Sequence, residues 1–340
     1  MKDKVNVAVV GATGLVGETM IEILEQRDFP VDTLVPLASE RSLGKKIRFK
    51  GKSIPCELLD DYDFSQVDIA LFSAGGSISA EHAPRAGAAG CIVVDNTSHF
   101  RNDDDIPLIV PEVNAHAIKD YPPRNIIANP NCSTIQMLVA LKPIQDAAGI
   151  SRINVATYQA VSGAGKSYVE TLAGQTANLM NSRDADPEDG TKRIAFNAIP
   201  HIDSFQDNGY TREEMKMVWE TRKIFEDDSI QVNPTCVRIP VFFGHSEAVH
   251  IETREHLSAA DARALLEKAP GVTVIDEHET GGYATPAQES AGEDPVFVSR
   301  IRDDISHPNG ISMWVVSDNV RKGAALNSVQ IAEILVREYL

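Results

Sequence analysis

VNVAVVGATGLVGETMIEIL, residues 5–24, decides the fold of the first part of the chain. Its opening residues form a short apolar run with high strand propensity, and a glycine-rich turn follows directly. Apolar residues then recur at helical spacing from Leu15 to Leu24. The stretch therefore predicts a strand, a tight turn and a helix, which together begin a βαβ unit.

The turn GATGLVG, residues 11–17, has GxxGxxG spacing, a variant of the dinucleotide-binding motif. Glycines let the backbone turn tightly, and they let a phosphate approach the helix N-terminus, where free N–H groups and the helix dipole favour an anion. Three glycines can also serve a tight turn alone. Their place between an apolar strand and a helix favours the binding of a dinucleotide.

Further apolar runs extend this pattern along the first part of the chain. They span residues 31–39, 67–74, 91–96 and 125–131. The alternation of strands and helices predicts a doubly wound, Rossmann-type parallel sheet.

The second part of the chain differs, because its predicted strands are longer and alternate more between apolar and polar residues. They span residues 153–163, 236–244, 248–253 and 310–319. This pattern is typical of a mixed sheet with one face against helices, so the fold class is α/β with a second, α+β domain. The polar segment 181–192 predicts an exposed loop, and residues 324–340 predict an amphipathic helix.

Charge and composition narrow the classes of function. The chain has 340 residues and a formal charge of −17, from 32 basic and 49 acidic residues, which argues against nucleic acid or an anionic membrane as a partner. No apolar run approaches the roughly 20 residues that cross a bilayer. The N-terminus does not read as a signal peptide, so we expect a cytoplasmic protein. The four cysteines form no CxxC pair and no Cys/His cluster, which predicts free thiols and no metal site.

The end of the second predicted strand bears on the choice of cofactor. In NAD enzymes this strand normally ends in an acidic residue that binds the ribose hydroxyls. Here Glu40 stands among Ser39, Arg41 and Ser42. A cation and two hydroxyl groups suit the extra phosphate of NADP, although a solvated turn with incidental charge is the alternative.

Cys132, in the motif NPNCST at residues 129–134, differs from the other three cysteines. It follows a polar turn and precedes a helical apolar run, so it lies at or near a helix N-terminus, where the dipole favours a thiolate. Cys56, Cys91 and Cys236 are expected to be small buried hydrophobic residues. Cys132 is therefore the candidate nucleophile.

The motif VRIPVFFGHSE supplies two further candidates. Arg238 lies within an apolar strand, where an unpaired cation is costly, so it requires a carboxylate from the protein or a substrate. His245 follows a glycine just past the end of this strand and is the candidate base for the cysteine, although a surface or core histidine is the alternative.

With the motifs GATGLVG, SHFR, NPNCST, YQAVSGAGK, EEMK, CVRIPVFFGHSE and SDNVRKGAALN in this order, the chain resembles the aspartate-semialdehyde dehydrogenases over essentially its whole length. The cysteine motif and the VRIP…GHSE motif are the specific ones, since the glycine motif occurs in many unrelated enzymes.

The resemblance implies a role for each matching residue. Cys132 is the acyl-accepting nucleophile, His245 the acid/base, and Asn131 helps to orient the thiohemiacetal oxygen. Gln159, Arg238 and Glu213 bind the amino-acid end of the substrate, with Gln159 also among the catalytic residues. Arg101 and Lys216 bind phosphate. The residues implied to line the cofactor site are Gly11, Thr13, Gly14, Leu15, Val16, Arg41, Ser42, Ser162, Gly163 and Asn319.

Two of these roles have plain structural alternatives. Arg101 is followed by an aspartate-rich segment, residues 102–105, and could simply pair with it. Glu213 and Lys216 are spaced i, i+3 and could form an exposed helical ion pair. The neighbouring Glu214 makes the choice of Glu213 less secure.

The activity implied is NADP- and phosphate-dependent interconversion of L-aspartate 4-semialdehyde and L-4-aspartyl phosphate through a cysteine thioester. The resemblance places it in lysine, threonine, methionine and diaminopimelate biosynthesis and implies a homodimer. It also implies an NADP-binding domain at residues 1–128, on which the C-terminal helix 321–340 packs, and a catalytic and dimerisation domain at 129–320.

Two enzymes share this chemical plan, N-acetyl-glutamyl-phosphate reductase and glyceraldehyde-3-phosphate dehydrogenase. The first usually has a different context around its cysteine, and the second needs more anion-binding groups around the aldehyde. A non-catalytic NADP-binding homologue is the alternative from another class, and the set of Cys132, Gln159, Arg238 and His245 argues against it.

Overall fold

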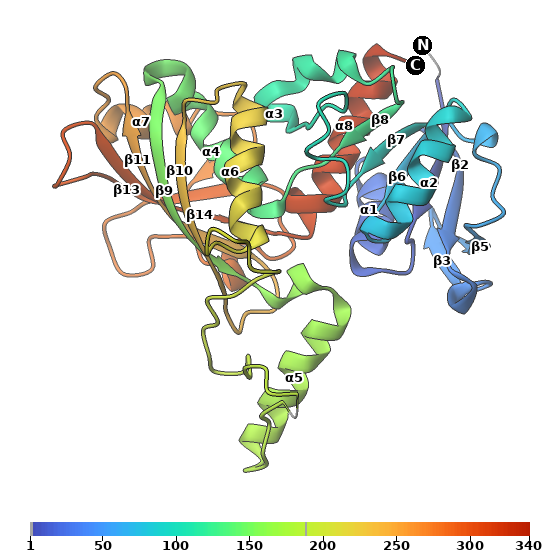
Figure 1. Cartoon of the computed structure of the whole chain (residues 1–340), viewed down its shortest axis with the longest axis horizontal. Helices are drawn as coiled ribbons and strands as arrows, with labels where there is room; N and C mark the ends of the chain where they lie inside the picture. The colour runs from blue at the N-terminus through green and yellow to red at the C-terminus, as the bar shows by residue number, and fades with distance from the viewer. Residues whose placement is uncertain (1–2, 188) are drawn as a thin grey trace. The chain divides into compact units, whose positions relative to one another are not determined.

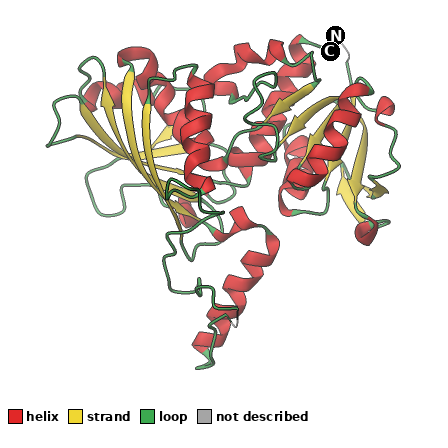
Figure 2. Cartoon of the chain, viewed as in Figure 1, coloured by secondary structure: helices red, strands yellow, loops and turns green. Residues whose placement is uncertain are grey.

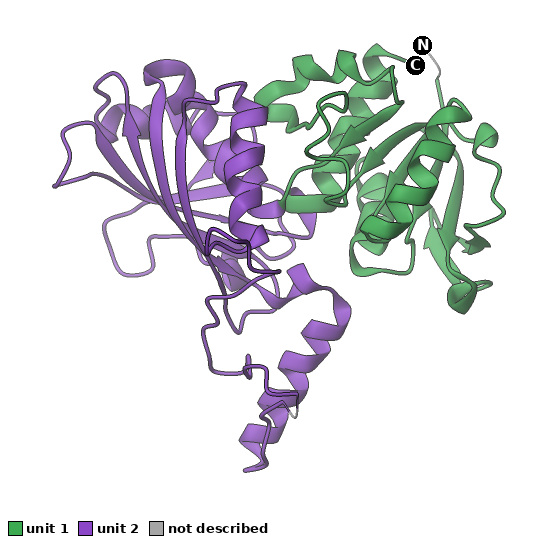
Figure 3. Cartoon of the chain, viewed as in Figure 1, with its two compact units in different colours: residues 1–131, 323–340 green, residues 132–322 purple. Residues whose placement is uncertain are grey.

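The computed structural model describes residues 3–187 and 189–340 and divides into two compact units (Figure 3). Unit 1 comprises residues 1–131 and 323–340, and unit 2 comprises residues 132–322. The predicted loop 181–192 contains no helix or strand among its described residues, and residue 188 lies outside them. Among the described residues, no helix is long and apolar enough to cross a membrane.

Unit 1 contains a six-stranded sheet in the order β5-β2-β1-β6-β7-β8, in which every pairing is parallel (Figures 1 and 2). Its strands are β1 (Val5–Val10), β2 (Val31–Ala38), β5 (Glu57–Leu58), β6 (Ile69–Phe72), β7 (Ile92–Asp95) and β8 (Ile126–Ala128). A small hairpin of β3 (Lys46–Phe49) and β4 (Lys52–Pro55) lies outside this sheet. The strand order changes direction at β1, which confirms the predicted doubly wound sheet.

Helices cover both faces of this sheet. The helices of unit 1 are α1 (Leu15–Gln26), α2 (Gly76–Ala88), α3 (Pro111–Asn114) and α8 (Leu326–Glu338). α1 and α8 pack together, and their buried residues share one apolar cluster with β1, β6 and β7. α2 packs against β6, β7 and β8, and its buried alanines lie outside that cluster. The amphipathic pattern of the last segment thus buries Val329, Ala332 and Leu335.

Unit 2 contains a six-stranded mixed sheet in the order β10-β9-β11-β14-β13-β12. Its strands are β9 (Ile150–Gln159), β10 (Gln231–Arg238), β11 (His245–Thr253), β12 (Val272–Val274), β13 (Val296–Asp303) and β14 (Gly310–Ser317). β9 pairs with β10 in parallel and with β11 in antiparallel fashion, as the prediction of a mixed sheet requires.

Helices of unit 2 pack on one face of the mixed sheet. They are α4 (Cys132–Ala148), α6 (Arg212–Phe225) and α7 (Ala259–Leu266), and α4 contacts β9, β11, β13 and β14. α5 (Lys166–Met180) extends away from the sheet in Figure 1. Along β11, His245, Glu247, Val249 and Ile251 are buried, whereas Ala248 and His250 between them are partly exposed. This alternation identifies the face of β11 that α4 covers.

Two predicted strands of unit 2 are wrong in extent. The strand predicted at residues 153–163 ends at Gln159, the last residue of β9, and residues 161–164 form a short 3-10 helix. The sequence pattern also predicts a single strand over residues 236–244, but β10 ends at Arg238, and His245 begins β11 rather than following a strand end. Pro240 has no N–H for a sheet hydrogen bond, and Gly244 has a φ of 88°. These two residues turn the chain from β10 into β11 and place Arg238 and His245 on different strands.

Candidate functional site

The glycine turn of unit 1 has the close contacts that a dinucleotide-binding turn requires. Gly11 has a φ of 83°, and Gly14 is the N-cap of α1. A Cβ on Gly17 would clash with the carbonyl oxygen of Gly11, so only glycine allows α1 to start this close to the turn. The amide end of α1 therefore stands directly at the carboxyl end of β1, where a pyrophosphate fits.

The turn after β2 lies beside the glycine turn. The Thr13 hydroxyl donates a hydrogen bond to the Ser42 hydroxyl at 3.3 Å. Ser42 is buried, whereas Glu40 and Arg41 are exposed. The Thr13 and Ser42 hydroxyl groups thus lie together at the carboxyl ends of β1 and β2, and Arg41 belongs to the same turn as Ser42.

Cys132 is the first residue of α4, and it is the one described cysteine that is not fully buried. Burial raises the pKa of Cys91 and Cys236 far above the ordinary thiol value, and it raises that of Cys56 as well. These three cysteines are buried, as predicted. The accessible thiol is therefore the one at a helix N-terminus.

His245 is completely buried, and one nitrogen of its ring is hydrogen-bonded to the backbone. Nδ1 accepts a hydrogen bond from the backbone N–H of Ala160 at 3.0 Å, so a neutral ring carries its proton on Nε2. Burial lowers the pKa of His245 to about 3, with Arg238 acting in the same direction and Glu213 against it. The histidine is therefore uncharged at neutral pH.

A chain of polar side chains leads from His245 across three elements of unit 2. Nε2 of Gln159, the last residue of β9, lies 3.4 Å from Nε2 of His245 and donates to Oε1 of Glu213 at 3.1 Å. Oε2 of Glu213 accepts from Lys216 at 2.9 Å. Lys216 also donates to Asp203 at 2.9 Å. We call Lys216, Glu213, Gln159 and His245 the polar chain.

Glu213 and Lys216 do form an ion pair, but the pair is not the exposed helical one that their i, i+3 spacing alone would suggest. The side chain of Glu213 is 7% exposed and that of Lys216 is 14% exposed. Burial lowers the pKa of Lys216, but Glu213 and Asp203 outweigh it, so the pKa is raised. Glu214 has a different role, because it accepts from the backbone N–H groups of Thr211 and Cys236 and so ties the start of α6 to β10.

Arg238 ends β10 and is buried beside the polar chain. Its Nη1 donates to the carbonyl oxygen of Ala160 at 2.7 Å. Burial lowers its pKa, whereas Glu213 and Cys132 favour the charged form. A Cβ on Gly163 would lie 3.0 Å from Nη1 of Arg238 and 3.3 Å from the His245 ring, so glycine keeps the space between these two groups open.

Ser162 and Asn319 bind each other. The Ser162 hydroxyl donates to Oδ1 of Asn319 at 3.1 Å, and the backbone N–H of Gly244 donates to the same oxygen at 3.0 Å. A Cβ on Gly244 would lie 2.6 Å from the carbonyl oxygen of Pro286. The glycine before His245 therefore serves a close contact within the protein.

Arg101 and Asn131 are buried residues of unit 1. Arg101 donates from Nε to the carbonyl oxygen of Thr97 at 3.1 Å and from Nη2 to that of Asn96 at 3.0 Å. Arg124 forms ion pairs with Asp103 and Asp105, two of the aspartates of the segment 102–105. Asn131 directly precedes α4.

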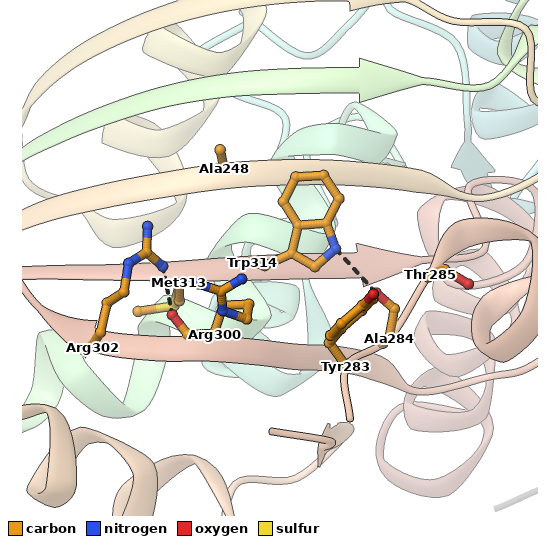
Figure 4. Close-up of a pocket in the computed structure, with 8 residues that line it drawn as sticks. All are labelled: Ala248, Tyr283, Ala284, Thr285, Arg300, Arg302, Met313 and Trp314. Atoms are coloured by element: carbon orange, nitrogen blue, oxygen red, sulfur yellow. Dashed lines mark hydrogen bonds between the residues drawn. The ribbon is translucent and has the colours of Figure 1, made fainter. Parts of the chain in front are cut away.

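Unit 2 also has a cavity that none of the predicted site residues lines. Its volume is about 300 Å³, and Figure 4 shows Trp314, Tyr283, Arg300 and Arg302 around it, with the Trp314 indole donating to the carbonyl oxygen of Ala284. Ala248 lines it from β11, on the strand face opposite to His245. The cavity and the polar chain therefore belong to opposite faces of the mixed sheet. Among the described residues, no group of acidic, histidine or cysteine side chains could hold a metal ion.

Sequence reasoning missed Asp203 and Glu247. Asp203 pairs with Lys216 from a loop, and its position depends on the folding of a segment without a motif. Glu247 is completely buried on β11, and the motif GHSE gives no sign of that burial.

The chain is similar to known proteins over its full length. The model of the family "Semialdehyde dehydrogenase, NAD binding domain" matches residues 6–121, and that of "Semialdehyde dehydrogenase, dimerisation domain" matches residues 141–322. An aspartate-semialdehyde dehydrogenase of Legionella pneumophila is 62% identical over 340 residues, which cover 100% of this chain and 98% of the relative.

Solved structures agree with these matches. The crystal structure of aspartate semialdehyde dehydrogenase II from Vibrio cholerae, complexed with ASA, has a TM-score of 0.97 and 60% identity and covers 100% of both chains. The crystal structure of aspartate semialdehyde dehydrogenase with NADP from Candida albicans has a TM-score of 0.77 and 25% identity and covers 98% of each chain.

Proposed function

The chain belongs to the aspartate-semialdehyde dehydrogenases, and we propose that it converts L-aspartate 4-semialdehyde, phosphate and NADP reversibly into L-4-aspartyl phosphate and NADPH. The members of this family are oxidoreductases of amino-acid biosynthesis that use a nicotinamide cofactor. The observation that carries this proposal is the polar chain, in which Lys216, Glu213 and Gln159 are hydrogen-bonded in turn and Gln159 lies 3.4 Å from His245. One unit thus brings together a cation, a carboxylate, an amide and a neutral imidazole.

The proposed chemistry begins at Cys132. Its thiolate adds to the aldehyde carbon, and the carbonyl oxygen becomes an oxyanion. In the free enzyme His245 carries its proton on Nε2, so it can donate a hydrogen bond to that oxygen, and Asn131 helps to orient it. Because Nδ1 already accepts from the Ala160 N–H, the ring acts through Nε2 alone, and it shares the Nε2 proton with the oxygen of the adduct.

The second half of the reaction needs sulfur. Bound NADP supplies the hydride acceptor. Loss of hydride from the adduct leaves a thioester on Cys132, and a thioester conserves enough of the oxidation energy for phosphate to form an acyl phosphate reversibly. An oxygen ester of serine would be a poorer acyl donor.

We propose that residues of opposite charge bind the charged groups of the substrates. Arg238 binds the carboxylate of the aldehyde, with Gln159 beside it, and Glu213 binds the amino group. Arg101 and Lys216 bind phosphate. Ser162, Gly163 and Asn319 are proposed to contact the cofactor, together with the glycine turn and Arg41.

The wider setting of the enzyme is also a proposal. The match to a dimerisation domain supports a homodimer. The two compact units support the division into an NADP-binding and a catalytic domain near residues 128/129 and 320/321. We propose a cytoplasmic enzyme that serves lysine, threonine, methionine and diaminopimelate biosynthesis.

The deciding experiment is phosphate-dependent NADP reduction with aspartate semialdehyde, run beside N-acetyl-glutamate semialdehyde. Activity with the first aldehyde only would support the proposal. Preference for the second would favour an N-acetyl-glutamyl-phosphate reductase. NADP binding without turnover would favour a non-catalytic homologue.

Lys216→Ala should raise the KM for phosphate about tenfold or more, because a charge-assisted hydrogen bond contributes about 1.5–3 kcal/mol. The KM for the aldehyde should rise less, through the loss of the ion pair with Glu213. Arg212→Ala, which removes an exposed cation from the same end of α6, is the matched control and should leave phosphate kinetics unchanged. The measurement is a steady-state titration of phosphate for each variant. Equal KM values for phosphate in both variants would show that Lys216 is not part of the phosphate site.

Arg41→Ala should raise the KM for NADP about tenfold. Arg41 is exposed, so its hydrogen bond to the ribose phosphate should contribute a free energy at the lower end of the range for charge-assisted hydrogen bonds. Any NAD activity should hardly change. Lys45→Ala, another exposed cation near this turn, serves as the control. The measurement is a pair of cofactor titrations at fixed ionic strength. Equal wild-type efficiency with NAD and NADP would show that this turn does not select the cofactor.

A further inference from the structure

Glu247 is a fully buried carboxyl group that has no part in the chemistry described above. It lies on β11 two residues after His245, so both side chains project from the same face of the strand. Across the sheet it stands opposite Thr157 of β9 and Val315 of β14, in the middle of unit 2. Burial of a lone carboxyl at such a place needs a physical reason.

The first turn of α4 packs on this face of β11. Ser133 and Gln136 are spaced i, i+3, so they share one side of α4, and both are completely buried. Nε2 of Gln136 donates to the backbone carbonyl oxygen of His245 at 3.5 Å. The helix turn that begins with Cys132 is therefore placed directly against the residue that begins β11.

The protonation state of Glu247 follows from its surroundings. Burial raises the pKa of Glu247 well above its ordinary value, although side-chain hydrogen bonding with Gln136 and Ser133 acts against the rise. Neither carboxyl oxygen accepts a hydrogen bond of ordinary geometry from the described residues, and the amide oxygen of Gln136 accepts none either. Two neighbouring acceptors are both satisfied if the carboxyl carries a proton and donates it to the amide oxygen.

A neutral acid also suits the chemistry of the neighbouring thiol. A carboxylate under the first turn of α4 would oppose the thiolate of Cys132 through like charge. A protonated carboxyl leaves the positive end of the helix dipole available to that thiolate.

We infer that Glu247, held as an uncharged acid that donates a hydrogen bond to Gln136, is a positioning residue that fixes the Cys132 turn of α4 relative to His245. The inference rests on the proposed function, because it takes Cys132 as the nucleophile. Glu247 does not touch the substrate, and its proton is not transferred during the reaction.

The test separates hydrogen bonding from packing. Glu247→Gln keeps the size and an uncharged donor, whereas Glu247→Leu keeps the bulk and removes the donor. Ile251→Ala, on the same face of β11 and farther from His245, controls for lost packing. For each variant we would measure kcat, the KM values, and the rate at which iodoacetamide alkylates Cys132.

Glu247→Gln should keep kcat and the alkylation rate within about twofold of wild type. Glu247→Leu should lower both about tenfold with little change in the KM values, which is the scale of one lost hydrogen bond. Ile251→Ala should reduce thermal stability and leave kcat unchanged. Full activity of Glu247→Leu would reduce Glu247 to a space-filling residue, and equal losses in Glu247→Gln and Glu247→Leu would overturn the neutral-acid assignment.

An infrared difference spectrum covers the case in which Glu247→Leu does not fold. Wild type minus Glu247→Gln at neutral pH should show the carbonyl stretch of a protonated carboxylic acid, and a carboxylate band in its place would overturn the inference. Alkylation of Cys132 and the infrared band need no turnover. A wild-type enzyme that is inactive on aspartate semialdehyde would therefore refute the proposed function, and these two measurements would still test the positioning role of Glu247.

Discussion

Cys132→Ala should lower turnover by about 10⁴-fold or more while the fold and NADP binding stay intact, since removal of a covalent nucleophile leaves only binding and electrostatic contributions. The substitution removes one sulfur atom at the first residue of α4, where the side chain is partly exposed. Alanine is a good helix former, so α4 should persist.

The measurement combines kinetics with chemical labelling. Iodoacetamide should alkylate Cys132 faster than any other cysteine, because Cys56, Cys91 and Cys236 are buried and their thiol pKa values are raised. Cys56→Ala is the control, since it removes a buried thiol of unit 1 and should leave turnover unchanged. Preferential labelling of a buried cysteine, with activity retained in Cys132→Ala, would contradict the assignment of the nucleophile.

The start of the fold could be predicted from local patterns. β1 and α1 begin where the apolar run and the helical spacing begin, because each pattern is local and the glycine turn separates them. The hairpin of β3 and β4 was not predicted, since these short strands have no apolar run and, apart from the buried Phe49, only exposed or half-buried residues. β13 was also missed: its four consecutive buried residues have no simple alternation, and a register shift interrupts its pairing with β14.

The site could be predicted only in part from sequence. The place of Cys132 at a helix start follows from a polar turn before an apolar helical run, and both features are local. The contact between Gln159 and Glu213 joins residues 54 positions apart, so it depends on the pairing of β9 with β10 and on the packing of α6 against β10. Their shared role came from the resemblance to a family.

Adjacent acidic residues show the limit of reading roles from sequence. Glu213 and Glu214 are neighbours in one motif, yet Glu213 joins the polar chain and Glu214 caps α6 and binds β10. The capping box of Thr211 and Glu214 has a sequence signature, which could have separated the two. Burial of Glu247 has no such signature, because it results from the packing of α4 on β11.

Arg238→Lys should lower kcat/KM for the aldehyde by a factor that corresponds to about 2–4 kcal/mol, the scale of a disrupted buried charge pair. Lysine keeps the charge, but it loses the planar fork of donors that matches a carboxylate. In the structure one nitrogen of Arg238 donates to the carbonyl oxygen of Ala160, which fixes the plane of the guanidinium beside Gly163. A flexible ammonium cannot satisfy that oxygen and a substrate carboxylate in the same fixed geometry.

The cofactor and a second arginine provide the controls for this variant. The KM for NADP should hardly change, because the loss concerns the carboxylate of the aldehyde alone. Arg263→Lys is the matched control: Arg263 also binds a backbone carbonyl and a carboxylate, both of Asp276, far along the chain from the proposed site. That variant should reduce thermal stability and leave kcat/KM unchanged. Arg238→Lys could instead raise the KM for NADP and the KM for the aldehyde together, with a matching loss of thermal stability. Arg238 would then be a structural residue whose cation supports β10 and the Ala160 turn, and it would not bind the substrate.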